Sequence, residues 1–108
     1  MPQKNFDELL IESVDEAFSS IGESSKQAIY FHLEKRFKIS KEEIPRRIRD
    51  FAEGIEKIFG LGAKFLEILI VRKLYERVGK PFELGTVEER PFIDHVEAAK
   101  LHYSKSKK

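Results

Sequence analysis

The stretch between Gly60 and Gly79 constrains the fold more than any other part of the sequence, because it gathers large apolar residues between two glycines. At about 100° per residue in an α-helix, these residues separate into two stripes. The longer stripe consists of Ile68, Val71, Leu74, Tyr75 and Val78. The shorter stripe, over the first turns only, consists of Phe65, Leu66, Leu69 and Ile70. A helix that is apolar on both sides must be covered on both sides, so the sequence predicts a central helix over residues 63–78.

Helix start signals divide the rest of the chain. Asn5 with Glu8, and Ser40 with Glu43, have the spacing of a capping box, in which two side chains satisfy the first amides of a helix. Ser24 repeats this signal, and residues 86–91 resemble residues 40–45, each ending in proline. Pro45 cannot donate a backbone hydrogen bond, so a single turn is expected before it and the main helix after it. The predicted helices therefore span residues 6–21, 24–37, 45–59, 63–78 and 91–103.

The fold class that follows is all-α, as a compact five-helix bundle with the helix over residues 63–78 central. No segment shows the alternating β-branched pattern of a strand. The chain has 108 residues, near the commonest size of one domain. We expect a single helical domain over residues 1–103, followed by a disordered basic tail over residues 104–108, which has no apolar side chain to bury.

Composition excludes several classes of protein. There is no cysteine, which removes disulfides and thiolate metal sites. The longest apolar run, from Ile68 to Val71, is far shorter than the roughly 18 residues of a membrane span. The N-terminal stretch is too acidic for a signal peptide, so we expect a cytoplasmic protein with no membrane partner. A charged fraction of 36% is also typical of thermophile proteins.

Catalytic and metal chemistry are not indicated. His95 and His102 share a helix face, but seven residues correspond to a rise of about 10 Å, too far for one ion. The carboxylate pairs at residues 42–43 and 88–89 occupy first helical turns, where the helix dipole favours negative charge. We therefore predict a protein that is not an enzyme and has no catalytic, metal-binding or cofactor-binding residues.

A basic cluster is the first candidate binding surface. It consists of Lys35, Arg36, Lys38, Lys41, Arg46, Arg47 and Arg49. The predicted elements here are a helix, a short turn and a capped helix, which is the outline of a helix-turn-helix. In that motif, Lys and Arg side chains contact the phosphates of the nucleic acid. The other interpretation is a solvated helix face, on which Arg46–Asp50, Arg49–Glu53 and Glu53–Lys57 pair at a spacing of four residues.

The turn at residues 59–64 has the sequence Phe-Gly-Leu-Gly-Ala-Lys, with Gly60, Gly62 and Lys64 in a pattern that resembles the turn of the helix-hairpin-helix DNA-binding motif. In that family, backbone amides of the turn hold a DNA phosphate beside a cation. The resemblance departs at Leu66, where the family has a small residue, and no proline precedes Gly60. The alternative is a glycine helix cap followed by a tight turn.

Three segments carry a second resemblance to a known family. They are Glu-Ser-Ser-Lys-Gln-Ala-Ile-Tyr-Phe-His-Leu-Glu at 23–34, residues 39–45, and Ile-Phe-Gly-Leu-Gly-Ala-Lys-Phe-Leu-Glu at 58–67. With these, the chain from Leu9 to Val78 resembles a small helical archaeal family, the output domain of the Nitrosopumilus type. The resemblance implies an all-helical domain with a signal-output role. It brings no catalytic residues to this sequence.

The shorter stripe of the central helix is the second candidate surface. Phe65, Leu66, Leu69 and Ile70 are flanked by charged residues, as an interface core is flanked by its rim. We predict that they form a homodimer interface and that Leu69→Glu yields a folded monomer. The favoured function is a non-enzymatic interaction or signal-output module with a regulatory role and an unidentified protein partner. The alternative is a small DNA-binding regulator that uses the basic cluster and Gly60 to Lys64.

Overall fold

The predicted central helix is present as α4 (Ala63–Val78), between Gly62 and Gly79. The structure, a computed structural model, describes residues 4–83 and 90–106, and these residues form helices and no strands. The other α-helices are α1 (Phe6–Ser19), α2 (Glu23–Phe37), α3 (Ile48–Phe59) and α6 (Phe92–Ser106). Two 3₁₀ turns, η1 (Lys41–Glu43) and η2 (Gly60–Gly62), precede α3 and α4. The all-α bundle predicted from the sequence is confirmed.

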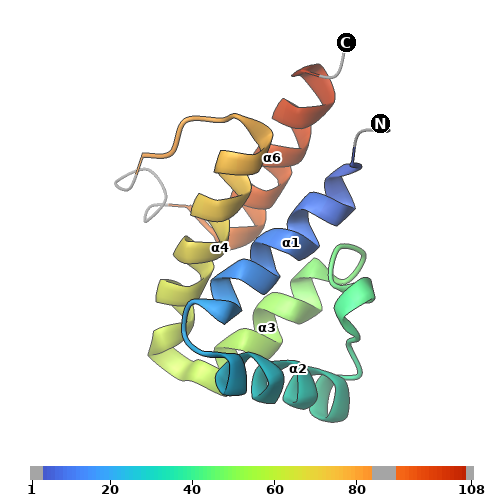
Figure 1. Ribbon diagram of the computed structural model, residues 1–108, viewed down its shortest axis with the longest axis vertical. Helices are drawn as coiled ribbons and strands as arrows, with labels where there is room; N and C mark the ends of the chain where they lie inside the picture. The colour runs from blue at the N-terminus through green and yellow to red at the C-terminus, as the bar shows by residue number, and fades with distance from the viewer. Residues whose placement is uncertain (1–3, 84–89, 107–108) are drawn as a thin grey trace.

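The helices pack around α4, whose most extensive neighbours are α1 and α6 (Figure 1). α1 runs antiparallel to α4, because Glu12 pairs with Arg77 while Glu16 pairs with Lys73 one turn earlier in α4. α2 packs against both α1 and α3 and lies across one end of the bundle (Figure 1). The helix predicted to need cover on two sides is therefore covered by the first helix and the last.

Phe51 anchors α3 to α1 and α6. Its side chain is fully buried, and its ring lies 6.3 Å from Phe18 of α1 and 6.3 Å from Phe92 of α6. Gly54, one turn further along α3, allows close packing on α2, since a methyl group there would lie 3.0 Å from the Leu33 side chain.

Both predicted capping boxes are confirmed, at Asn5 with Glu8 and at Ser40 with Glu43. Two other start signals do not mark the residues at which their helices begin. α2 begins at Glu23 after Gly22, whose φ of 120° suits glycine, so Ser24 lies inside the helix instead of capping it.

The third helix begins at Ile48 and not at Pro45. The backbone turns through residues 44–47, and Arg47 has a non-helical φ of −121° and ψ of 42°. α3 is therefore shorter at its start than the proline signal predicts.

The ends of two other helices also differ from the prediction. α1 ends at Ser19 and not at residue 21. α6 continues to Ser106, whose hydroxyl donates to the Tyr103 carbonyl oxygen, so the prediction of a disordered tail from residue 104 is wrong for residues 104–106. The repeated start signal at residues 86–89 and the last two lysines lie outside the described residues.

Candidate functional site

The shorter stripe of α4 is divided between the core and the surface. Leu66 is 3% exposed and Ile70 is fully buried, so the prediction that they form a dimer interface is wrong. The reason is their spacing: Leu66 and Ile70 lie eight and four residues before Leu74 and continue the same buried line along the helix. Phe65, one position earlier, remains 70% exposed.

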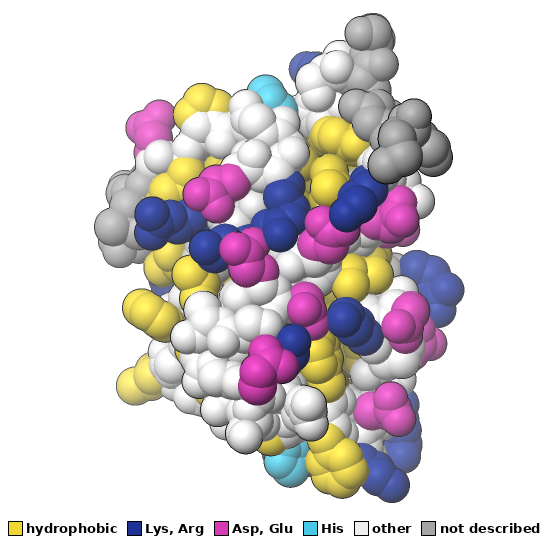
Figure 2. Space-filling model, viewed as in Figure 1, with side chains coloured by type: hydrophobic (Ala, Val, Ile, Leu, Met, Phe, Trp, Pro, Cys, Tyr) yellow, Lys and Arg dark blue, Asp and Glu magenta, His cyan; other side chains and the backbone are white. Residues whose placement is uncertain are grey.

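Three apolar residues spaced four apart form a line, which we call the α4 strip: Leu61 in η2, and Phe65 and Leu69 in α4. Leu61 is 100% exposed and Leu69 is partly buried against the core. In Figure 2, hydrophobic side chains stand out along the edge of the molecule that α4 forms. The strip therefore runs from η2 onto the first half of α4, with Leu61 and Phe65 largely exposed.

Ion pairs join the second half of α4 to α1. The Arg77 guanidinium lies 2.7 Å from the Glu16 carboxylate, and the Lys73 amine lies 3.6 Å from the same side chain. Lys73, one of the charged residues that flank the shorter stripe, therefore contributes to the packing of α4 on α1.

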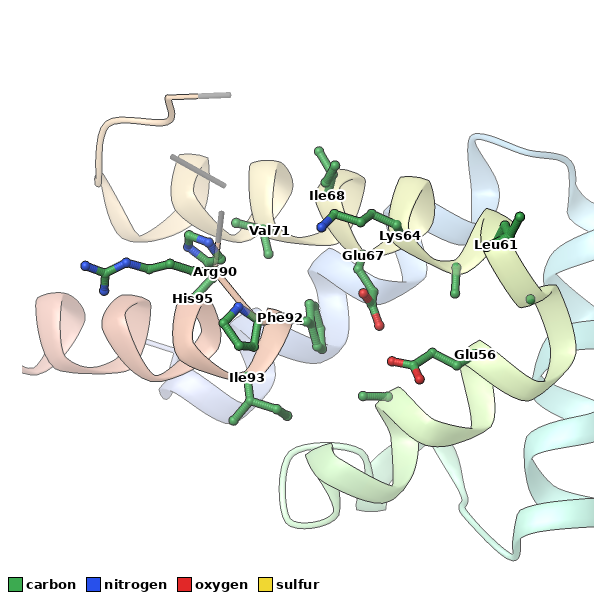
Figure 3. A pocket seen from close by; sticks show the side chains of 14 residues that line it. Glu56, Leu61, Lys64, Glu67, Ile68, Val71, Arg90, Phe92, Ile93 and His95 are labelled. Carbon is green, nitrogen blue, oxygen red and sulfur yellow. The ribbon is translucent and has the colours of Figure 1, made fainter. Parts of the chain in front are cut away.

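A pocket opens on another side of α4, between α3, η2 and the start of α6 (Figure 3). Its volume is about 690 Å³. Apolar side chains from two helices form most of its wall, with Ile68 and Val71 from α4 and Phe92 and Ile93 from α6. Concave, mainly apolar pockets of this size with few polar groups are typical of ligand sites.

Two carboxylates face each other in this pocket, Glu67 from α4 and Glu56 from α3 (Figure 3). Oε2 of Glu67 is buried and has no hydrogen-bond partner among the described residues. Burial and the negative charge of Glu56 raise the pKa of Glu67 to about 7, while Lys64 acts in the opposite direction. A partly buried carboxyl with a raised pKa in a pocket, as at Glu67, marks a candidate functional site.

Sequence reasoning missed Glu67 and Glu56. The available signal was Glu67 itself, a single carboxylate between Leu66 and Ile68 in the most apolar stretch of the chain. Its counterpart Glu56 comes from a different helix, and only the path of the chain through η2 brings the two together.

Replacing Glu67 by glutamine should stabilise the protein at high pH only. A carboxyl whose pKa rises on folding, here from 4.5 to about 7, binds its proton more tightly in the folded state. Its ionisation therefore destabilises the fold as pH rises through that interval, with no effect below it. We expect Glu67→Gln to raise the free energy of unfolding by about 1–2 kcal/mol near pH 8, allowing for partial exposure.

Urea unfolding at about pH 8 and about pH 4 measures this difference. The matched control is Glu76→Gln, an exposed carboxylate on the same helix, which should change neither value. An equal gain for Glu67→Gln at both pH values would show that its cause is packing and not the carboxylate charge.

His95 has a structural role. It is 4% exposed, and its Nδ1 lies 2.8 Å from the Tyr75 hydroxyl in a hydrogen bond that joins α6 to α4. Within residues 4–83 and 90–106, no group of three or more histidines and carboxylates is placed to hold a metal ion.

Part of the basic cluster is engaged in contacts within the protein. Arg47 donates to the backbone carbonyl oxygens of Phe37 and Lys38 at the end of α2, and it pairs with Asp50 at 3.1 Å. Lys41 pairs with Asp15 of α1 at 3.0 Å.

The ion pairs predicted along α3 are replaced by others. Arg46 precedes α3, and its contact is with Glu43 at 3.4 Å instead of Asp50. No ion pair between Arg49 and Glu53, or between Glu53 and Lys57, occurs in the described part of the chain. Lys35 and Arg36 lie over aromatic rings of α2. Four exposed cations of the cluster therefore have no ion pair among the described residues: Lys35, Arg36, Lys38 and Arg49.

The glycine turn is a helix cap followed by a 3₁₀ turn. Gly60 has a φ of 58°, which favours glycine, and its amide donates to the Glu56 carbonyl oxygen. That amide is therefore used by α3 and does not point to a phosphate. Lys64 lies on the first turn of α4 at the pocket.

None of the helices in the described residues has the length and apolar character needed to span a bilayer. Comparison with known proteins found no matching family model, no matching curated protein and no matching solved structure.

Proposed function

We propose that this protein is a non-enzymatic interaction module that pairs with a second copy of itself through the α4 strip. The observation that carries the proposal is the exposure of Leu61 at 100% and Phe65 at 70% on one line. Two-fold pairing is the commonest closed symmetry. In an antiparallel crossing centred on Phe65, Leu61 of one copy opposes Leu69 of the partner subunit, so the strip is complementary to itself.

The expected dimer is weak. Burial of a large apolar side chain contributes about 1.5–3 kcal/mol, and association costs about 4–15 kcal/mol. Within the α4 strip, Leu61 and Phe65 are largely exposed and Leu69 is not. The free energy gained by burying Leu61 and Phe65 in two copies therefore exceeds the cost of association by little. Weak, concentration-dependent pairing suits a regulatory or signal-output role, which is the role implied by the resemblance to the archaeal output domains.

Phe65→Glu tests the pairing. We expect the wild-type mass in sedimentation equilibrium to rise towards that of a dimer over about a hundredfold range of concentration, by mass action. Phe65→Glu should remain a monomer over that range and keep its helical circular dichroism. Phe65 replaces Leu69 as the test position, because Leu69 packs partly against the core and its substitution would also affect folding.

Phe31→Glu is the matched control. Phe31 is 56% exposed but lies on α2, where it contacts His32 and Lys35 and lies outside the α4 strip. A wild type that stays monomeric at the highest concentration, or equal loss of pairing in both variants, would overturn the proposal.

A further inference from the structure

The pocket between α3, α4 and α6 has the features of a site for a small ligand, and it shares Leu61 with the α4 strip. Its volume of about 690 Å³ exceeds what a few waters need and is in the range of small-molecule sites. Phe92, Val71 and Ile68 provide apolar walls from two helices, and Glu56 and Glu67 provide the acceptors at one end (Figure 3). An amphipathic molecule matches this division.

Glu67 lacks a hydrogen-bond donor in the part of the chain that the structure describes, whereas Glu56 is exposed to solvent. Oε2 of Glu67 is buried without a hydrogen-bond partner among the described residues, and the carboxylate of Glu56 points towards Glu67 across the pocket (Figure 3). A buried acceptor without a donor costs roughly 1–3 kcal/mol, and more when it is charged. A cation with several N–H donors would satisfy both carboxylates at once and remove their mutual repulsion.

We propose that this pocket binds an amphipathic primary amine, with its ammonium group between Glu56 and Glu67 and its apolar body against Phe92 and Val71. The ammonium has three donors in a compact head, which suits two carboxylates facing each other. The apolar walls favour an amine carried on a hydrocarbon body over a fully hydrated polyamine.

The positions of the cationic residues distinguish an amine from an acid. Lys64 and Arg90 are exposed, and in Figure 3 the Arg90 guanidinium lies well away from the two carboxylates, at the far end of the pocket. The Lys64 side chain runs along α4 near Ile68, and His95 lies at the Arg90 end, hydrogen-bonded to Tyr75 (Figure 3). The end of the pocket with Glu56 and Glu67 is therefore negative, and the end with Arg90 is positive.

A divalent cation is a poorer match than an amine. Calcium takes about six to eight oxygen ligands, and magnesium requires near-octahedral geometry. Glu56 and Glu67 supply carboxylates, but in the part of the chain that the structure describes no third histidine or carboxylate converges on them.

Binding should also release protons. Glu67, with its pKa of about 7, is largely protonated at slightly acid pH. An ammonium beside the carboxyl favours its ionised form and lowers its pKa, so the proton leaves as the amine binds. Affinity should therefore rise between about pH 5 and pH 8 and level off above that.

The probe is n-hexylamine, titrated calorimetrically at about pH 6.5 in two buffers with different ionisation enthalpies. We expect saturable binding, proton release to the buffer, and an affinity at least about tenfold above those of hexanol and hexanoate. Glu67→Gln, which keeps the shape of the side chain, should weaken hexylamine binding about tenfold or more and abolish the proton release. Glu56→Gln should weaken binding in the same direction.

Phe65→Glu is the matched control, because it leaves the pocket intact and should not alter hexylamine affinity. If Glu67→Gln fails to fold, Glu56→Gln and the wild-type pH dependence carry the test. Tighter binding of hexanoate, equal binding of hexanol, or no saturable binding of hexylamine to the wild type would each overturn the proposal.

Discussion

Ile70→Glu is expected to unfold the protein, whereas Phe65→Glu leaves it folded. Ile70 is fully buried, on the line of α4 that continues through Leu74. An unpaired charge at such a position costs several kcal/mol in desolvation, and the lost apolar burial adds about 1.5–3 kcal/mol. A domain of this size has about 5–15 kcal/mol of stability in total, so one substitution removes most of it.

Far-ultraviolet circular dichroism and a urea titration measure this effect. The matched pair keeps the new side chain and the helix constant and changes only the position, from 70% exposed at Phe65 to fully buried at Ile70. Ile70→Val, which removes one methyl group, should cost about 0.5–1.5 kcal/mol and keep the fold. Cooperative unfolding of Ile70→Glu close to the wild-type midpoint would show that Ile70 faces solvent.

The contrast between Phe65 and Ile70 marks the limit of prediction from sequence. The bounds of α4 were predictable, because the chain supplies a strong apolar run and a glycine at each end, with Gly79 in the left-handed region at a φ of 76°. Which lines of that helix become core depends on the directions from which α1 and α6 approach. The two lines differ by one residue position, or about 100° around the helix, and local periodicity cannot decide between them.

The pocket was less predictable than the helix that forms one of its walls. Glu67 stood out in an apolar stretch, but its environment depends on Glu56 of α3 and on Phe92 of α6. The signal at Pro45 failed for a similar reason. Arg47 donates to the end of α2, and this tertiary contact accompanies a turn that delays the start of α3 to Ile48.

Phe51→Ala is expected to cause the largest loss of stability among uncharged substitutions. The Phe51 ring is fully buried between Phe18 of α1 and Phe92 of α6, both at 6.3 Å. Its removal leaves a cavity at the junction of three helices, where collapse of one helix would pull it away from another. Such substitutions cost about 3–5 kcal/mol, equivalent here to a fall of at least about 12 °C in Tm.

Phe31→Ala, an exposed phenylalanine on α2, should stay within about 0.5 kcal/mol of wild type in the same urea titration. Phe51→Leu, which retains most of the volume, should cost clearly less than Phe51→Ala. A loss below about 1 kcal/mol for Phe51→Ala would mean that the helices close the cavity freely, and that α3 is not fixed against α1 and α6 by this ring.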